Sequence, residues 1–344
     1  MRIGLIARAE NSGLGIQTWE FARHMQPAKT LIIRPHSDRG FYPQRFDEDA
    51  SIVQGLPGTR HLHEFVDGLD VIFTCETPYN YELFSIAAAA GVASVLQFNF
   101  EFLDYLARPR LPRPDLLAAP SPWHLDDVPG DKRMLPVPIA TDRFTPALRS
   151  GPARRFLHIA GRPAIHDRNG TADLLAALPM VRTPITVIIR CQDPDYVPRL
   201  LAGGVRIPAH ITLEVVGADT ENYWDNYRDA DVLVMPRRFG GLCLPVQEAL
   251  AAGMPVIMPA ISPNLWLPQS WLVPATLAGR FMARSMIGIY SADPERLAMK
   301  IDEFATIPAF YVASQRQAVR LATERSWANL KPVYDRTFAE LVAA

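Results

Sequence analysis

The chain has 344 residues, of which 49% are hydrophobic and 21% charged, and its formal net charge is -1. This balance excludes a disordered chain and gives no overall electrostatic attraction to nucleic acid or to anionic membranes. Because the length exceeds that of most single hydrophobic cores, we expect two domains.

The first half predicts a mostly parallel sheet whose strands alternate with helices. A strand over residues 2–7 leads through a loop with Gly13 and Gly15 into a helix over residues 16–25. Further short apolar runs predict strands at residues 30–33, 71–75, 93–98 and 116–119. This alternation is typical of a Rossmann-like α/β domain with helices on both faces.

A proline-rich segment, residues 135–154, breaks both helix and strand and predicts a linker. A second Rossmann-like series follows, with strands expected at residues 156–160, 185–189, 211–216, 232–235 and 255–258. Helices are expected at residues 170–178, 221–228, 245–252, 293–306, 308–324 and 327–342. We therefore predict domains over residues 1–148 and 149–325, and a C-terminal helical segment, 326–344, that packs back toward the N-terminal domain.

Cysteine use and apolar runs indicate a cytoplasmic protein. Cys75, Cys191 and Cys243 are too far apart for a zinc-binding pattern, which favours buried free thiols and a reducing compartment. The first apolar run is too short for a signal sequence, and the longest apolar stretch, residues 85–98, is too short to span a bilayer.

The segment from residue 231 to residue 259, DVLVMPRRFGGLCLPVQEALAAGMPVIMP, predicts a strand, a glycine-containing loop, a helix and a strand in succession. Gly240 and Gly241 allow the backbone to approach a ligand, and Pro245 suits a first helical turn, where free N–H groups and the helix dipole favour phosphate. Glu248 follows one turn later, within reach of a ribose whose phosphates lie at the helix start.

A second segment, LHIAGRPAIHDRNG at residues 157–170, places Arg162 just after a strand and Arg168 just before a helix. Two guanidinium groups suit a diphosphate, because their planar forks form charge-assisted bidentate bonds with phosphate oxygens.

Together these segments resemble the retaining GT-B glycosyltransferases of the large glycogen-synthase-like group (glycosyltransferase group 1, family 4 type). That family has D-V-x-V-x-P, a glycine-containing loop, P-x-x-E-A and G-x-P-V. It also has a G-R pair with a basic residue six positions after the Arg, which Arg162 and Arg168 match. Of the family's two loop glutamates, Glu248 matches the second, whereas Gly240 replaces the first, which in the family contacts the transferred sugar.

The resemblance implies a GT-B fold, with two Rossmann-like domains facing across a donor and acceptor cleft, and it implies site residues. The implied catalytic residues are Arg162, Arg168 and Asn99, the last by a soft alignment with a family histidine. The implied donor-binding residues are Gly13, Gly15, Arg162, Arg168, Arg238, Phe239, Gly240, Gly241, Leu242, Leu244 and Glu248. Glu101 is a further acid/base candidate, although a capping or solvated role is the more common one for such a residue.

The implied activity is transfer of a sugar from a nucleotide-diphosphate sugar, with UDP-sugar favoured, to an unidentified acceptor hydroxyl with retention of configuration. No cofactor or metal is expected. The spaced aspartates Asp193 with Asp195 and Asp229 with Asp231 are explained by a turn and by a strand start instead.

Three alternatives stay open. The acceptor is a hydroxymethylated base in DNA, for which Arg108, Arg110 and Arg113 form a small basic cluster although the net charge does not indicate nucleic acid. The chain is a catalytically silent nucleotide-sugar-binding module, because Gly240 replaces a glutamate. The most distant alternative is a Rossmann oxidoreductase, whose G-x-G-x-x-G pattern is incomplete because Thr18 stands at the third glycine.

Overall fold

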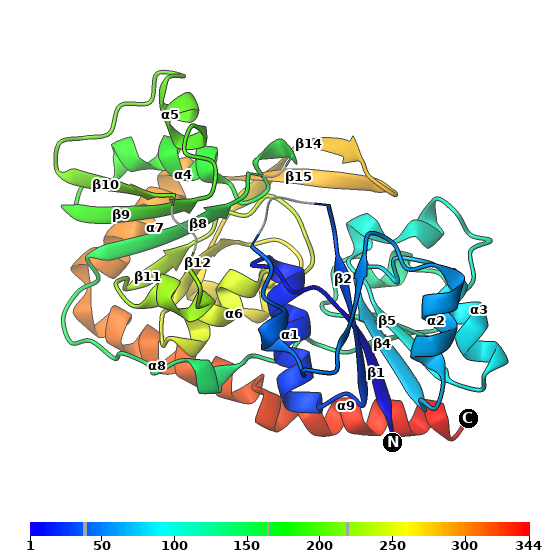
Figure 1. The fold of residues 1–344 in the computed structure, drawn as a ribbon. Coiled ribbons are helices and arrows are strands. Elements are labelled where there is room, and N and C mark those ends of the chain that lie inside the picture. Colours follow the sequence, from blue (N-terminus) through cyan, green and yellow to red (C-terminus); the bar gives the residue numbers. More distant parts are fainter. Residues whose placement is uncertain (37–39, 164, 218–219) are drawn as a thin grey trace. The chain divides into compact units, whose positions relative to one another are not determined.

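The structure is a computed structural model that describes residues 1–36, 40–163, 165–217 and 220–344. Internal contacts divide it into two units (Figure 1). Unit 1 contains Met1–Pro138, Ala283–Ser285 and Trp327–Ala344, and unit 2 contains Ile139–Met282 and Met286–Ser326.

Unit 1 is built on a seven-stranded sheet with the order β3-β2-β1-β4-β5-β6-β7, and every pairing is parallel. The strands are β1 (Ile3–Ala7), β2 (Lys29–Arg34), β3 (Ser51–Gln54), β4 (Val71–Cys75), β5 (Ala93–Gln97), β6 (Leu116–Ala119) and β7 (Lys132–Met134). The central strands β1 and β4 are buried throughout, as expected for a parallel sheet covered on both faces. The sequence predicted five of these strands and missed the edge strands β3 and β7.

The helices of unit 1 are α1 (Gly13–Met25), α2 (Thr59–Val66), α3 (Glu82–Ala89) and the C-terminal α9 (Trp327–Val342). Helix α9 lies against β4 and β5. Its Tyr334 and Phe338 are fully buried among aromatic rings that include Phe21 and Phe73. The Tyr334 hydroxyl also receives a hydrogen bond from Nε2 of Gln97 at 3.0 Å, so the last helix is part of the unit 1 core.

Unit 2 contains a six-stranded parallel sheet with the order β10-β9-β8-β11-β12-β13. The strands are β8 (Arg155–Gly161), β9 (Ile185–Cys191), β10 (Ile211–Val216), β11 (Val232–Val234), β12 (Val256–Pro259) and β13 (Leu272–Val273). Both halves of the chain are thus α/β units with parallel sheets, which confirms the predicted Rossmann-like class.

The helices of unit 2 are α4 (Thr171–Ala177), α5 (Tyr196–Leu201), α6 (Leu244–Ala251), α7 (Pro294–Thr306) and α8 (Pro308–Glu324). Helix α4 packs against α7, and α6 packs against α8 (Figure 1). Strand order reverses between β8 and β11, and right-handed crossovers that run in opposite directions place α4 and α6 on opposite faces of the sheet.

Several elements of unit 2 differ from expectation, and the short helix α5 and strand β13 were not predicted. An antiparallel hairpin, β14 (Ala275–Met282) and β15 (Met286–Ala292), was not predicted. The helix expected at residues 221–228 is only a short 3₁₀ helix, η8 (Tyr223–Tyr227), which buries Tyr223 and Tyr227. The other 3₁₀ segments are η1 (Pro43–Arg45), η2 (Phe100–Phe102), η3 (Asp104–Leu106), η4 (Leu125–Asp127), η5 (Thr141–Arg143), η6 (Ile165–Asp167), η7 (Leu178–Met180), η9 (Asn264–Trp266) and η10 (Gln269–Trp271).

Candidate functional site

Two loops of unit 2 meet where the strand order reverses. The first loop follows the carboxyl end of β8, and the second follows the carboxyl end of β11. This edge of a doubly wound sheet is the usual ligand-binding place. Gly170, at the end of the first loop, lies so close to the second that an added Cβ would stand 2.0 Å from the Pro236 carbonyl oxygen. The amide of Arg238 donates to the Arg168 carbonyl at 2.9 Å. The backbones of the two loops are therefore held together by contacts of the chain itself.

The side chain of Asp167 caps the N-terminus of α4. Asp167 accepts hydrogen bonds from the amides of Thr171 at 3.0 Å and Ala172 at 2.8 Å, and from the Tyr196 hydroxyl at 2.6 Å. An aspartate in this position satisfies N–H groups that otherwise have no partner within the helix. The α4 amides are thus engaged by a carboxylate of the protein itself.

The N-terminus of α6 is built differently. Its N-cap residue, Cys243, makes no side-chain capping bond, and Pro245 lies in the first turn. Gly240, Gly241, Leu242 and Leu244 lead into this turn, the glycines buried and the leucines half-buried. Helix N-termini whose amides are not capped by a side chain attract anions, and in this respect the start of α6 suits an anion better than the start of α4.

Glu248 lies on the next turn of α6, is buried, and accepts a hydrogen bond from the Tyr227 hydroxyl. Burial and the neighbouring carboxylate raise the pKa of Tyr227 well above its usual value, so the phenol stays protonated and remains a donor. The sequence analysis did not identify Tyr227. Its contact fixes the orientation of a carboxylate that the sequence placed near a ribose.

The arginines of the two loops have different surroundings. Arg162 is exposed, whereas the Arg168 guanidinium lies over the ring of Phe239, 5.5 Å from its centroid. Phe239 is buried and packs against Phe281, with 5.0 Å between ring centroids. Arg238 donates from Nε to the Tyr290 carbonyl at 3.0 Å and from Nη1 to the His166 carbonyl at 3.2 Å, which ties both loops to β15.

Gly240 stands where two guanidinium groups converge. A Cβ at this position would lie 2.4 Å from Nη2 of Arg237 and 2.6 Å from Nη2 of Arg168, and the Gly240 φ is 115°. Neither the space nor the backbone conformation suits a glutamate there. At the position where the family pattern has a glutamate, Arg237 and Arg168 therefore occupy the space that a glutamate side chain would need. Arg237 was not predicted as a site residue, although the Arg237–Arg238 doublet marked a basic loop.

His158, in the middle of β8, is also absent from the predicted site. It is completely buried, with Nδ1 2.8 Å from the Val234 carbonyl and Nε2 2.9 Å from Oγ1 of Thr171. A carbonyl only accepts, so Nδ1 carries the proton and Nε2 accepts from the threonine hydroxyl. Burial lowers the pKa of His158. This neutral ring joins β8, β11 and the start of α4.

In unit 1 the predicted glycines lie at the start of α1. The Gly15 amide donates to Oγ of Ser12 at 3.1 Å, and a Cβ on Gly15 would stand 2.0 Å from the Glu10 carbonyl oxygen. Gly13 is exposed in the same turn. Asn99 follows β5, is buried, and donates from Nδ2 to the Glu76 carboxylate. These residues share the carboxyl edge of the unit 1 sheet.

The other polar candidates of unit 1 are engaged in contacts of the fold. Glu101 is buried, which does not fit the solvated role considered for it. Arg108 pairs with Asp104, and the Arg113 guanidinium lies 4.9 Å from the ring centroid of Tyr105. Arg108, Arg110 and Arg113 are nevertheless all exposed, so nucleic-acid binding by this cluster stays a prediction.

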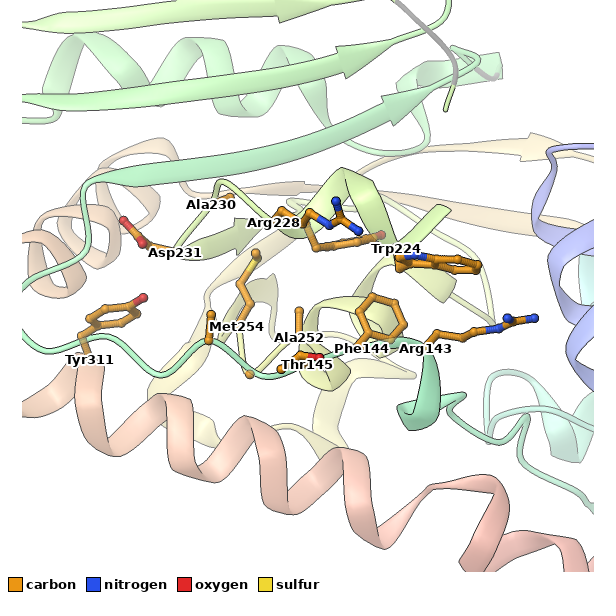
Figure 2. Close-up of a pocket in the computed structure, with 13 residues that line it drawn as sticks. Arg143, Phe144, Thr145, Trp224, Arg228, Ala230, Asp231, Ala252, Met254 and Tyr311 are labelled. Carbon is orange, nitrogen blue, oxygen red and sulfur yellow. The ribbon is translucent and has the colours of Figure 1, made fainter. Parts of the chain in front are cut away.

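Each unit has a cavity. One of about 510 Å³ in unit 1 lies between the loop after β4 and residues 104–112. One of about 250 Å³ in unit 2 lies at the amino ends of β11 and β12, at the edge of the sheet opposite the two loops. Figure 2 shows Phe144, Trp224 and two arginines toward one end of it and Asp231 with Tyr311 toward the other. Tyr227 also lines this cavity, so one residue connects it with Glu248.

The spaced aspartates have structural partners. Asp193 pairs with Arg199 at 2.6 Å, and Asp231 accepts from the amides of Arg154 and Arg155 and from the Arg149 side chain. The described residues include no group of three or more His, Cys, Asp or Glu side chains arranged to hold a metal ion. Within the same ranges, no helix combines the length and apolar character needed to cross a membrane.

Residues 154–302 match the model of the family described as Glycosyl transferases group 1. This match confirms the resemblance to group 1 glycosyltransferases over the segment that contains both loops, α4 and α6, whereas retention of configuration stays a prediction. No curated protein is similar in sequence to this chain at a significant level.

Solved structures similar to the whole chain include a sucrose-phosphate synthase from Thermosynechococcus elongatus, at 15% identity and a TM-score of 0.68, which covers 100% of both chains. HepE from Anabaena in complex with UDP and glucose matches at 12% identity and a TM-score of 0.69, covering 99% of this chain and 100% of HepE. A glycosyltransferase from Rickettsia africae matches at 12% identity and a TM-score of 0.72, covering 99% of this chain and 98% of its own. The predicted GT-B fold is confirmed.

Proposed function

We propose that this chain transfers a sugar from a nucleoside diphosphate donor, with uridine as the favoured base, to an acceptor hydroxyl, with retention of configuration and without a metal. The group 1 match over residues 154–302 supports a glycosyltransferase. Several solved structures with this fold contain UDP or a UDP-sugar, which supports the choice of base. The acceptor stays unidentified.

One observation carries the proposal: helices α4 and α6, which begin where the strand order of the unit 2 sheet reverses, differ in how their N-termini are capped. Asp167 caps α4, whereas α6 begins without a side-chain cap and carries Glu248 one turn later. A diphosphate at α6 has the helix dipole, glycine amides and Arg168 to stabilise it. Glu248, oriented by Tyr227, would hold the ribose hydroxyls.

In this proposal the bond between the anomeric carbon and the phosphate oxygen breaks while the acceptor oxygen bonds to the same carbon. The leaving diphosphate takes the electron pair, and one of its oxygens accepts the acceptor's proton, so no protein nucleophile is needed. Arg162, Arg168 and the α6 amides would stabilise the charge that develops on the leaving group, which is usually a large contribution to catalysis.

Thermal shifts against UDP, GDP, ADP and their sugars test the donor site, because a ligand that binds the folded state raises its stability. A selective shift that Arg162→Ala and Glu248→Ala both abolish would support the assignment. Arg199→Ala, a surface variant outside both loops, is the control. A folded sample that no nucleotide stabilises would contradict a donor site at α6.

A catalytically silent nucleotide-sugar-binding module is the second candidate, and the arginine-filled space at Gly240 favours it. The two candidates differ in donor hydrolysis. We expect the enzyme to release the nucleoside diphosphate slowly from its bound donor without an acceptor, which a coupled assay detects. A donor that binds but stays intact, with no release above the rate of Glu248→Ala, would support the silent module.

A further inference from the structure

Unit 2 contains a cavity that the proposed reaction does not use. It has a volume of about 250 Å³ and lies at the amino ends of β11 and β12. Its walls come from residues 143–147, from η8 and the residues after it, from the connection between α6 and β12, and from Tyr311 of α8. Doubly wound sheets bind their substrates at the carboxyl edge of the strands, so a molecule in this cavity would be a second ligand, separate from the donor.

Aromatic rings form one end of the cavity (Figure 2). The Phe144 ring lies edge-on to the rings of Tyr223 and Tyr227, with 5.9 Å between centroids in each pair. Trp224 packs on Tyr223 with a centroid distance of 5.1 Å. Phe144 and Trp224 are only half-buried. A ligand with an apolar face would cover the remaining aromatic surface, and removing such surface from water is favourable.

The charged side chains that line the cavity have partners within the chain. Arg228 pairs with Asp225 at 2.7 Å, and Asp231 pairs with Arg149. The Arg143 guanidinium lies over an indole ring of the same wall, 4.7 Å from the ring centroid, an arrangement that stabilises a cation. Because these charges are compensated, the cavity favours a neutral ligand over an ion.

The rest of the wall adds hydrogen-bonding groups. Burial and the neighbouring Asp231 carboxylate raise the pKa of Tyr311, so its hydroxyl stays protonated and can donate. The exposed Thr145 supplies a second hydroxyl. A neutral molecule with an apolar face and a rim of hydroxyl groups matches this combination of rings and hydroxyls, and a sugar ring has that structure.

One residue connects the cavity with the donor site. Tyr227 lines the cavity, contacts Phe144 through its ring and donates through its hydroxyl to Glu248. A ligand that packs against Phe144 therefore restricts the phenol and, with it, the carboxylate. A restricted Glu248 loses less conformational freedom when it binds a ribose, and the donor then binds more tightly.

We propose that this cavity binds a neutral sugar as an effector, and that the bound sugar raises the affinity of the donor site through Tyr227. The coupling rests on the proposed function, whereas the sugar site does not. Because coupling between two sites is reciprocal, the donor raises the affinity for the sugar by the same factor.

Ligand-observed NMR tests the sugar site with the methyl glycosides of glucose, galactose and mannose, and with glucuronate and glucosamine as charged counterparts. We expect at least one neutral glycoside to bind, and to bind tighter than either charged sugar. Trp224→Ala removes part of the aromatic wall and Thr145→Trp fills the cavity from an exposed position, so each should weaken this binding about 10-fold. Thr276→Trp, at an exposed threonine of β14 outside the cavity, is the control.

Calorimetry tests the coupling as the ratio of the dissociation constants of UDP, GDP or ADP measured without and with the glycoside. We expect a ratio of at least about 5 for the parent chain. Tyr227→Phe keeps the ring in the cavity and removes the hydroxyl, so its ratio should be about 1 while the glycoside still binds. Trp224→Ala should bind the nucleotide alone as the parent chain does.

The outcomes separate this inference from the function on which it rests. If no glycoside binds the folded parent chain, or if Trp224→Ala and Thr145→Trp bind it as well as the parent does, the sugar site is rejected. A charged sugar that binds tighter than the neutral ones overturns the choice of ligand. If the glycoside binds and leaves the nucleotide affinity unchanged, or if Tyr227→Phe keeps the parent ratio, the coupling is rejected. If the glycoside binds in the cavity and no nucleotide binds, the proposed function fails while the sugar site stands.

Discussion

Gly240 is the residue whose replacement the structure restricts most clearly. We expect Gly240→Ala to lower the free energy of unfolding by about 1–3 kcal/mol, because the φ of 115° strains an L side chain and the new Cβ meets two guanidinium groups. Urea denaturation measures the change. Gly279→Ala is the matched control in the same unit, since no heavy atom lies within 4 Å of its added Cβ. Equal effects of the two substitutions would contradict the close packing at Gly240.

Because of His158, we expect the free energy of unfolding to depend on pH in the acidic range. Its folded-state pKa is lowered by burial, whereas the unfolded chain has a histidine pKa of about 6.5. Above that value neither state is protonated and no stability is lost. As the pH falls below it, the unfolded state binds a proton that the folded ring resists, so stability falls by up to about 1.4 kcal/mol per pH unit. Urea unfolding from pH 7.5 to 5 should show a steeper loss for the parent chain than for His158→Gln. The exposed His61→Gln should keep the parent slope, and an unchanged slope in His158→Gln would refute the assignment.

Single residues also show where the sequence was informative. Arg162, Arg168, Gly240 and Glu248 could be named as candidates from the sequence because their spacing is part of a local pattern, and their roles in a donor site stay predictions. Tyr227 could not be named, because its hydroxyl reaches Glu248 across 21 positions of sequence and no local pattern encodes that contact. Arg237 was not identified for a related reason. Tertiary packing, rather than the local sequence, decides which of the neighbouring residues Arg237 and Arg238 is buried.

The start of α4 gives a prediction at the scale of an element. Asp167 caps the helix through two amide bonds, and replacing such a residue by alanine costs about 1 kcal/mol. We therefore expect Asp167→Ala to lower the free energy of unfolding by about that amount. Asp195→Ala is the control, because Asp195 holds the N-cap position of α5 without a side-chain capping bond. A loss in Asp195→Ala as large as in Asp167→Ala would show that the capping contacts do not account for the effect.

Elements were predicted best where one feature of the sequence dominates. Helices α8 and α9 were predicted with the bounds that the structure has, because Pro308 suits the first turn of α8 and each helix has a periodic apolar pattern. Only Arg325 and Ser326 separate the two helices. The β14–β15 hairpin was missed because β14 is largely exposed and its residues do not alternate regularly between apolar and polar. Its sequence has no two-residue turn of the Asn-Gly type to reveal it.

At the scale of the whole molecule, the chain returns from unit 2 to unit 1 for its last helix. The sequence gives α9 its amphipathic pattern, but which sheet it covers depends on contacts with residues far earlier in the chain, Phe21 and Phe73 among them. The parallel sheets were predictable from alternation of strands and helices. The edge strand β7, only three residues long, was not, because pairing with β6 rather than composition defines it.

Because α9 packs on the sheet of unit 1, we expect the stability of unit 1 to depend on this C-terminal helix. Removing residues 327–344 would expose the face of β4 and β5 that α9 covers, whereas unit 2 loses none of its own strands or helices. The truncated chain should therefore show faster hydrogen exchange in β4 and β5 than in β8 and β9. Phe338→Ala, at a fully buried ring, should cost about 3–5 kcal/mol in unit 1, and Phe102→Ala, at a ring that is 48% exposed, should cost little. Equal loss of protection in both units would mean that they unfold as one, and that α9 stabilises the whole molecule rather than unit 1.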